Sequence, residues 1–413
     1  MIVCFIAILV VAFSTSNSFL VSDSHGSNGQ QYSWPMFHYD EGHTGYSVSS
    51  APDSNNLLWR FKTNGEVVSS PVVNDGMVYV GSRDHFLYSL NATTGKEVWK
   101  YQTGSQVEST PSVVDGRIYV GSNDNFVYCL DADDGSLIWR FETQGPVLSL
   151  TVFDAKVYAS SADTFVYCIE GTSGDEIWRY GSGGWAASIT AVDGKVFVGS
   201  WVPGYNFSCL NANTGTVIWN FQPRINIIPT YAAVIGGKVF IGEQSIPGYM
   251  YCMDANTGDL VWDKQLELPV GSSPAVGGGN VFVGSNDDFV YCFDADDGSM
   301  IWRFETQGPV LSSPAVANEK VYFGSNDGFV YAIDQYEGAL TWSYQTGNFV
   351  RSSPAISAGM LFVGSDDGYL YAFGPGQETF FSLEVRLALA IVIVAVLLII
   401  ILLLIRSRRK KMR

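Results

Sequence analysis

The feature that most constrains the fold is a repeat of about forty residues that ends in a tryptophan. The repeated tryptophans are Trp59, Trp99, Trp139, Trp178, Trp219, Trp262, Trp302 and Trp342, with successive gaps of 40, 40, 39, 41, 43, 40 and 40 residues. Seven of the eight follow a glycine by four residues, as a turn into a last strand requires. A period near forty is typical of a β-propeller, in which each repeat forms one blade.

One complete repeat, residues 66–102, shows the strands of a blade. It contains four short runs of β-branched and aromatic residues, at 67–73, 77–80, 86–90 and 97–102. The segments Asn74-Asp75-Gly76 and Thr93-Thr94-Gly95 supply residues that tolerate positive φ in tight turns. We therefore predict four antiparallel strands per blade.

The two ends of the repeat array complement each other. Residues 57–63 have the sequence of a fourth strand with no first three before them, and residues 349–373 supply three strands with no tryptophan after them. Residues 121–149 and 284–312 differ at only three of 29 positions, which indicates a duplicated half of four blades. We predict an all-β, eight-bladed propeller over residues 57–374, in which the N-terminal strand completes the C-terminal blade and leaves no long free edge.

Apolar runs lie at both ends of the chain. Residues 2–13 are apolar and too short to span a bilayer, so we interpret residues 1–20 as a signal peptide, with an uncleaved anchor as the alternative. After a linker at 375–386, residues 387–405 are nineteen consecutive apolar residues, which predict a transmembrane helix. Residues 406–413 form a basic tail. The positive-inside rule puts this tail in the cytoplasm and the propeller outside the membrane.

A segment at residues 33–56 precedes the propeller and has no counterpart in the repeats. It contains His38, Asp40, Glu41 and His43, but the spacing matches no established metal motif. We expect no metal here and interpret the aromatic residues of the segment as apolar anchors that hold it against the propeller. These residues are Trp34, Phe37 and Tyr46.

Three sequence patterns carry a resemblance to a known family. They are the segment WPMFHYDEGHTG, the turn and strand D/N-A-x-T/D-G-x-x-x-W, and the strand pair VYVGSxDxFVY. Over residues 33–373 the chain resembles the pyrroloquinoline-quinone-like (PQQ-like) propeller repeat family. That family includes quinoprotein alcohol dehydrogenases and the lipoprotein propeller of the bacterial outer-membrane assembly machine.

Similarity to the dehydrogenases would imply PQQ and calcium over the propeller axis, an acidic base and a ring formed by adjacent cysteines. The chain has no Cys-Cys pair and no long insertion between blades. We therefore expect no cofactor and a non-catalytic role. A membrane-tethered PQQ-dependent oxidoreductase is the alternative.

Five cysteines occupy one equivalent position in successive repeats, where other repeats have Ser or Ala. They are Cys129, Cys168, Cys209, Cys252 and Cys292. We expect them to be buried and free, because equivalent positions in neighbouring blades lie too far apart for a disulfide. Acidic turns such as Asp131-Ala-Asp-Asp-Gly135 lack the remaining ligands of a calcium loop, so we interpret them as Asx turns.

The innermost strands line the axial channel, and most of them begin with small neutral residues. The departures are Glu108, Trp185, Arg224, Tyr231 and Arg351. We predict these as a ligand- or partner-binding set; the alternative is a channel filled by side chains and water. Blades four and five also have enlarged turns, at residues 200–207 and 243–250, which form the candidate partner surface.

The charge balance narrows the class of partner. Residues 21–384 contain 16 Lys and Arg against 40 Asp and Glu, a balance of −24. Such an acidic domain disfavours nucleic acid. We expect a membrane-anchored extracytoplasmic propeller that acts as a scaffold or recognition module for an envelope or cell-surface protein. A small-ligand sensor is a third hypothesis, although the tail is too short for a signalling domain.

Overall fold

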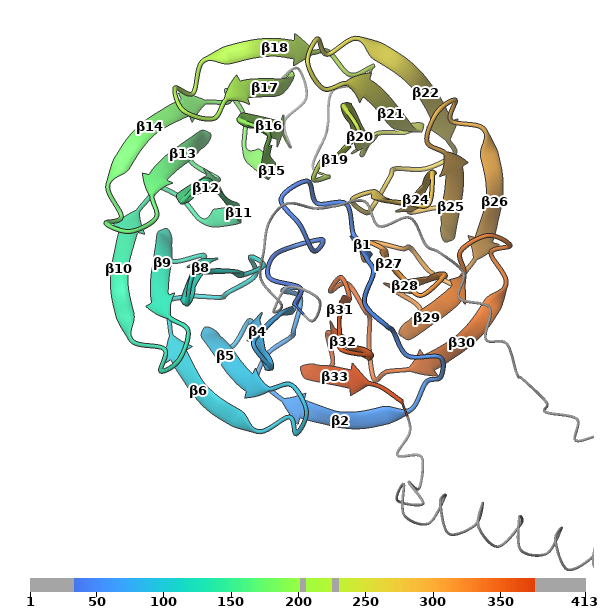
Figure 1. Ribbon diagram of the computed structural model, residues 1–413, viewed down its shortest axis with the longest axis horizontal. Helices are drawn as coiled ribbons and strands as arrows, with labels where there is room; N and C mark the ends of the chain where they lie inside the picture. The colour runs from blue at the N-terminus through green and yellow to red at the C-terminus, as the bar shows by residue number, and fades with distance from the viewer. Residues whose placement is uncertain (1–32, 201–205, 225–229, 376–413) are drawn as a thin grey trace, which may run out of the picture.

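The computed structural model describes residues 33–200, 206–224 and 230–375. Within these residues the chain forms a ring of eight blades around a central axis (Figure 1). Each blade is an antiparallel sheet of four strands, and blade 7 gains a fifth, parallel strand, β1 (Tyr46–Ser47). The predicted eight-bladed, all-β architecture is confirmed.

Strands occupy four positions in each blade, from the axis outward. The innermost strands are β3 (Val72–Asn74), β7 (Ser112–Val114), β11 (Val147–Phe153), β15 (Ala186–Val192), β19 (Ala233–Ile235), β23 (Ala275–Gly277), β27 (Ala315–Ala317) and β31 (Ala355–Ser357). The second strands are β4 (Met77–Gly81), β8 (Arg117–Gly121), β12 (Lys156–Ser161), β16 (Lys195–Ser200), β20 (Lys238–Glu243), β24 (Asn280–Gly284), β28 (Lys320–Gly324) and β32 (Met360–Gly364). The third strands are β5 (Phe86–Asn91), β9 (Phe126–Asp131), β13 (Phe165–Glu170), β17 (Phe207–Asn211), β21 (Gly248–Asp254), β25 (Phe289–Asp294), β29 (Phe329–Asp334) and β33 (Tyr369–Phe373). The outer strands are β6 (Glu97–Gln102), β10 (Leu137–Glu142), β14 (Glu176–Gly181), β18 (Val217–Phe221), β22 (Leu260–Leu266), β26 (Met300–Glu305), β30 (Leu340–Gln345) and β2 (Leu57–Lys62).

The ring closes in blade 8, where the N-terminal strand β2 pairs antiparallel with β33 near the C-terminal end of the repeat array. The register aligns Trp59 with Ala372 and Arg60 with Tyr371. Segments from the two ends of the array therefore share one sheet, and no blade is left with three strands.

The tryptophans connect each blade to the next. For seven of the eight tryptophans the indole Nε1 donates a hydrogen bond of 2.9–3.2 Å to a backbone carbonyl of the following blade. Trp342 of blade 7 instead donates to the carbonyl of Pro52 at 3.2 Å, in the segment that precedes β2. The turn glycine lies directly under the ring: a Cβ on Gly135 would sit 2.6 Å from the Trp99 ring, and its φ is 73°. No other residue fits this turn without strain.

The innermost strand of blade 1 is shorter than predicted. The sequence predicts a strand over residues 67–73, whereas β3 begins at Val72. Pro71 cannot donate a ladder hydrogen bond. Ser69 instead uses its hydroxyl, which accepts from the amide of Gly81 at 3.3 Å and donates to the Ser109 carbonyl of the next blade at 2.9 Å. The Ser-Ser-Pro segment therefore serves contacts between blades.

Residues 34–50, which we term the plug segment, cross one end of the axis (Figure 1). Backbone hydrogen bonds join this segment to blades 1, 2, 5, 6, 7 and 8, at Val73, Val113, Val234, Val276, Val316 and Gly359. His43 reaches blades 3 and 4, with its ring nitrogens 3.3 Å from Thr151 Oγ1 and 3.1 Å from Thr190 Oγ1. The plug segment thus contacts all eight blades and covers the free edges of the innermost strands.

Two further expectations concern cysteines and the membrane. Cys129, Cys168, Cys209, Cys252 and Cys292 are buried and free, as predicted. Burial raises the pKa of each of these thiols to about 12. No helix among the described residues is long and apolar enough to cross a membrane. The predicted signal peptide and the predicted span at 387–405 lie outside the described residues.

Candidate functional site

The axial cavity is closed by the plug segment at one end and lies open at the other, which we term the mouth. Its volume is about 300 Å³. Phe37 of the plug segment and Tyr231 of blade 5 both line the cavity and pack against each other, with ring centroids 4.3 Å apart. Burial raises the pKa of Tyr231 to about 12. The mouth is therefore the accessible end of the channel.

Hydroxyl groups form much of the cavity wall. Three of these hydroxyls accept a hydrogen bond at 2.9–3.0 Å from a backbone amide of a neighbouring blade. Ser273 and Ser313 accept from the preceding blade, and Ser70 accepts from blade 8, across the seam where the ring closes. These hydroxyls already hold neighbouring blades together. The polar character of the wall is thus explained by the ring itself.

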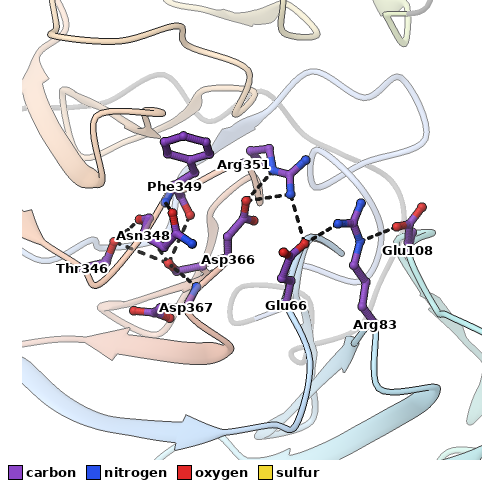
Figure 2. A network of polar contacts seen from close by, with 10 residues as sticks. Glu66, Arg83, Glu108, Thr346, Asn348, Phe349, Arg351, Asp366 and Asp367 are labelled. Carbon is purple, nitrogen blue, oxygen red and sulfur yellow. Dashed lines mark hydrogen bonds and ion pairs between the residues drawn. The ribbon is translucent and has the colours of Figure 1, made fainter.

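Charged residues gather on one sector of the mouth and form a ladder of alternating sign (Figure 2). In blade 8, Arg351 donates from Nη2 to Asp366 Oδ2 at 2.6 Å and to Glu66 Oε2 of blade 1 at 3.2 Å. Arg83 also pairs with Glu66, and its Nε lies 2.5 Å from Glu108 Oε1 of blade 2. The ladder crosses the seam where the ring closes and ends on a carboxylate that lines the cavity.

Asp366 is the most deeply placed carboxylate of the ladder. Its side chain is 4% exposed, and Oδ1 has no hydrogen-bond partner among the described residues. Burial raises the pKa of Asp366, and the hydrogen bond and charge of Arg351 act in the opposite direction. The Asp366 carboxylate depends on Arg351 as its partner, because a buried carboxylate without a partner lowers the stability of the folded state.

The plug segment contributes two buried histidines beneath the cavity. Burial lowers the pKa of His38 to about 4; burial and the neighbouring His38 lower that of His43 to about 3. Both rings are therefore neutral near pH 7. The described residues contain no group of three or more His, Cys, Asp or Glu able to hold a metal ion.

The structure separates the five predicted channel residues. Glu108 and Tyr231 line the cavity, and Arg351 belongs to the ladder at the mouth. Trp185 is 55% exposed and does not line the cavity. Arg224 pairs with Asp263 of the outer strand β22, with Nη2 2.6 Å from Oδ2, and its guanidinium lies over Tyr249. Arg224 is outside the axial cavity because its partner lies on the outer edge of blade 5.

Sequence reasoning missed three members of the ladder: Glu66, Arg83 and Asp366. A signal for each was present in the repeat. Arg83 and Asp366 follow the serine of the second-to-third-strand turn, where blades 2, 6 and 7 have asparagine. Glu66 stands where blades 3, 6 and 7 have proline. Comparison of the turn positions, as well as the innermost strands, finds all three.

A family model described as outer membrane protein assembly factor BamB matches residues 45–159, 127–249 and 247–377. These matches cover nearly the whole ring. The chain belongs to the PQQ-like β-propeller family. A search of curated proteins found no match.

Solved structures agree with this family in fold. BamB from Moraxella catarrhalis matches with a TM-score of 0.67 at 16% identity, over 77% of this chain and 99% of that chain. The quinohemoprotein alcohol dehydrogenase from Comamonas testosteroni matches with a TM-score of 0.70 at 16% identity, over 84% and 81%. The computationally designed Ika8 protein also matches, with a TM-score of 0.70 at 16% identity over 78% and 99%. At this identity the likeness concerns the fold alone.

The described cavity residues do not fit the quinone of the dehydrogenases. PQQ is a tricarboxylate and needs cationic partners, whereas no described Lys or Arg lines the cavity, and its charged lining residue, Glu108, is a carboxylate already paired with Arg83. The described carboxylates also form no cluster suited to calcium.

Proposed function

We propose that this PQQ-like propeller is a membrane-anchored, extracytoplasmic scaffold that binds an envelope or cell-surface protein at its mouth. The observation that carries the proposal is the asymmetry of the ring. The plug segment contacts all eight blades at one end, so of the two ends of the axis it is the mouth that leaves the axial cavity open among the described residues.

Exposed apolar side chains on the mouth support a protein partner. Trp185 is 55% exposed, Ile246 72%, Leu268 38% and Phe349 47%. These residues lie before innermost strands or in the enlarged turn of blade 5, at the end opposite the plug segment. They depart from the repeat: Phe349 stands where blades 3, 6 and 7 have proline, and Leu268 stands where blades 3 and 7 have glycine. Exposed aromatic and aliphatic groups of this kind are typical of protein interfaces.

The chemistry of the mouth suggests a partner with basic groups around an apolar centre. The ladder carries three carboxylates and two guanidinium groups, and residues 21–384 have a balance of −24. A basic surface would be attracted by this field. The family name, which describes an assembly factor, agrees with a role in binding other proteins.

The proposed membrane anchor rests on the C-terminal sequence. The apolar run at residues 387–405 and the basic tail after it are the features that support a single membrane span with the propeller outside. A scaffold held in this way needs no catalytic group of its own.

Site-specific photo-crosslinking in the native membrane tests the proposal. A photoreactive residue at Ile246 or Phe349 should give the same protein adduct. The same residue at Val48 or Thr94, both exposed on the plug end, should give none. Equal adducts from both ends, or none from the mouth, would contradict the proposal. Saturable calorimetric binding of PQQ in the presence of calcium would instead support the quinoprotein alternative.

A further inference from the structure

At seven of the eight seams between blades, the third strand presents a tyrosine on which an aromatic ring from the outer strand of the preceding blade can pack. We term this position over the tyrosine the seat. The residue two positions after the tryptophan is aromatic in seven blades, and in six of these seams it packs on the third-strand tyrosine of the next blade. The centroid distances are 5.4 Å for Phe61–Tyr88, 5.6 Å for Tyr101–Tyr128, 5.4 Å for Phe141–Tyr167, 5.2 Å for Phe221–Tyr251, 5.7 Å for Phe304–Tyr331 and 5.9 Å for Tyr344–Tyr371. In the seventh, Tyr180 meets Ser208, with the two hydroxyl oxygens 3.3 Å apart.

The seam between blades 5 and 6 lacks this ring. Lys264 of β22 takes the position, so no aromatic residue of blade 5 packs on Tyr291. The lysine stem lies along the turn of blade 6 instead, where a Cβ on Gly298 would meet Lys264 Cε at 2.6 Å. Tyr291 keeps only ring contacts from its own strand, with Phe289 and Phe293. The seat for a ring is thus present without the ring.

A cavity of about 330 Å³ opens at this seam. Tyr291, Phe293 and Met300 provide apolar walls, and Lys264, Glu267 and Arg303 provide charged groups. This volume lies within the range of small-molecule sites. The cavity is separate from the axial cavity, with which it shares no lining residue.

The lining of this cavity contains two cations, Lys264 and Arg303, and one carboxylate, Glu267, whereas the domain as a whole is acidic. Lys264 and Arg303 form no ion pair with any residue that the structure describes. Glu267 and Arg303 are exposed, so water screens both charges, and the Arg303 guanidinium lies 4.4 Å from the centroid of the Phe289 ring. Two unpaired cations beside an aromatic seat favour a ligand that carries an anion next to a ring, because carboxylates form charge-assisted hydrogen bonds with both groups.

We propose that the cavity between blades 5 and 6 binds a small aromatic carboxylate. Its ring takes the place over Tyr291 that the chain's own aromatic residue fills in six other seams. Its carboxylate lies between Lys264 and Arg303. This site does not depend on the function proposed for the mouth, since the two lie at different places in the ring.

Calorimetric titration of the full-length protein with phenylacetate tests this proposal. We expect saturable one-to-one binding in the submillimolar range. Phenethylamine, which carries the opposite charge on a similar ring, should bind at least tenfold more weakly. Absence of saturation with phenylacetate, or equal binding of the two compounds, would overturn the proposal.

The most direct test is a variant in which a side chain of the protein fills the seat over Tyr291. Lys264→Phe restores the residue type of the other blades, so it should fold normally and lose phenylacetate binding. Lys96→Phe, at an exposed turn position, makes the same substitution away from the seam and should bind as the wild type does. Retained binding by Lys264→Phe would show that phenylacetate binds elsewhere.

A direct readout covers the case in which Lys264→Phe does not fold. In protein labelled at methionine methyl groups, phenylacetate should shift the Met300 signal of the wild type through the ring current. Met360, which packs in the core of blade 8, should not shift. An unshifted Met300 signal at saturating phenylacetate would contradict the assignment.

Discussion

At the scale of single residues, Asp366 is held in a nearly buried position by one cation. Arg351 donates to Asp366 Oδ2 from Nε at 2.7 Å and from Nη2 at 2.6 Å. The corresponding residues of blade 7, Leu311 and Asn326, are uncharged. The repeat thus offers two solutions for the same pair of positions, one ionic and one neutral.

We predict that Arg351→Leu lowers the free energy of unfolding by about 3 kcal/mol, because the Asp366 carboxylate is left buried without a partner. Arg351→Leu combined with Asp366→Asn recreates the blade 7 pair and should recover most of this loss. Chemical denaturation of the two variants measures the difference. Equal destabilisation in both would show that the loss arises from packing of the Arg351 side chain.

At the scale of elements, the two buried histidines of the plug segment make the stability of the protein depend on pH. Unfolding restores the pKa of His38 and His43 from about 4 and 3 toward 6.5, so the unfolded state binds more protons at mildly acidic pH. Stability from this source is complete above pH 6.5 and is lost as the pH falls toward the folded values. Asp40, whose pKa is raised by burial, acts in the opposite direction at lower pH.

We predict that the free energy of unfolding falls between pH 7 and pH 5, by up to about 2 kcal/mol for each histidine. His43→Gln keeps a side chain that can reach Thr151 and Thr190 and should remove roughly half of this slope. Denaturation at pH 7, 6 and 5 measures it. His85→Gln removes a histidine outside the plug segment, and an equal loss of slope in that variant would exclude the plug as the cause.

At the scale of the whole molecule, one sheet holds the two ends of the array together. Strands β2 and β33 pair with Arg60 opposite Tyr371, and within blade 2 Arg140 stands opposite Tyr128 in the equivalent register. Arg60 and Tyr371 lie near opposite ends of the repeat array in the sequence, whereas Tyr128 and Arg140 lie in consecutive strands. The two pairs therefore differ mainly in the length of chain between them.

We predict that a disulfide at Arg60→Cys and Tyr371→Cys stabilises the protein by about 2–3 kcal/mol more than one at Arg140→Cys and Tyr128→Cys. The reason is the entropy of the longer loop that the first disulfide closes in the unfolded state. Both variants lose a tyrosine hydrogen bond to aspartate, so that cost cancels. Thermal unfolding of oxidised and reduced forms provides the comparison, and equal gains would contradict the loop-entropy explanation.

The sequence by itself determined the features that recur in every repeat. The period, the turn glycines and the repeated tryptophans predict eight blades. The four β-rich runs within a repeat predict four strands per blade. The incomplete ends of the array predict that the N-terminal strand closes the ring. These features follow from local residue patterns, since each blade repeats the same hydrogen bonds and the same Trp99-type contact with its neighbour.

Only the tertiary structure decided what the irregular residues do. Arg224 and Arg351 both depart from the repeat, yet Arg224 pairs on the outer edge and Arg351 at the mouth. Lys264 is visible as a substitution, but its consequence, an open seat over Tyr291, depends on the neighbouring blade. The plug segment crosses the axis because eight innermost strands leave free edges there. Contacts between distant segments depend on ring geometry, which no local pattern encodes.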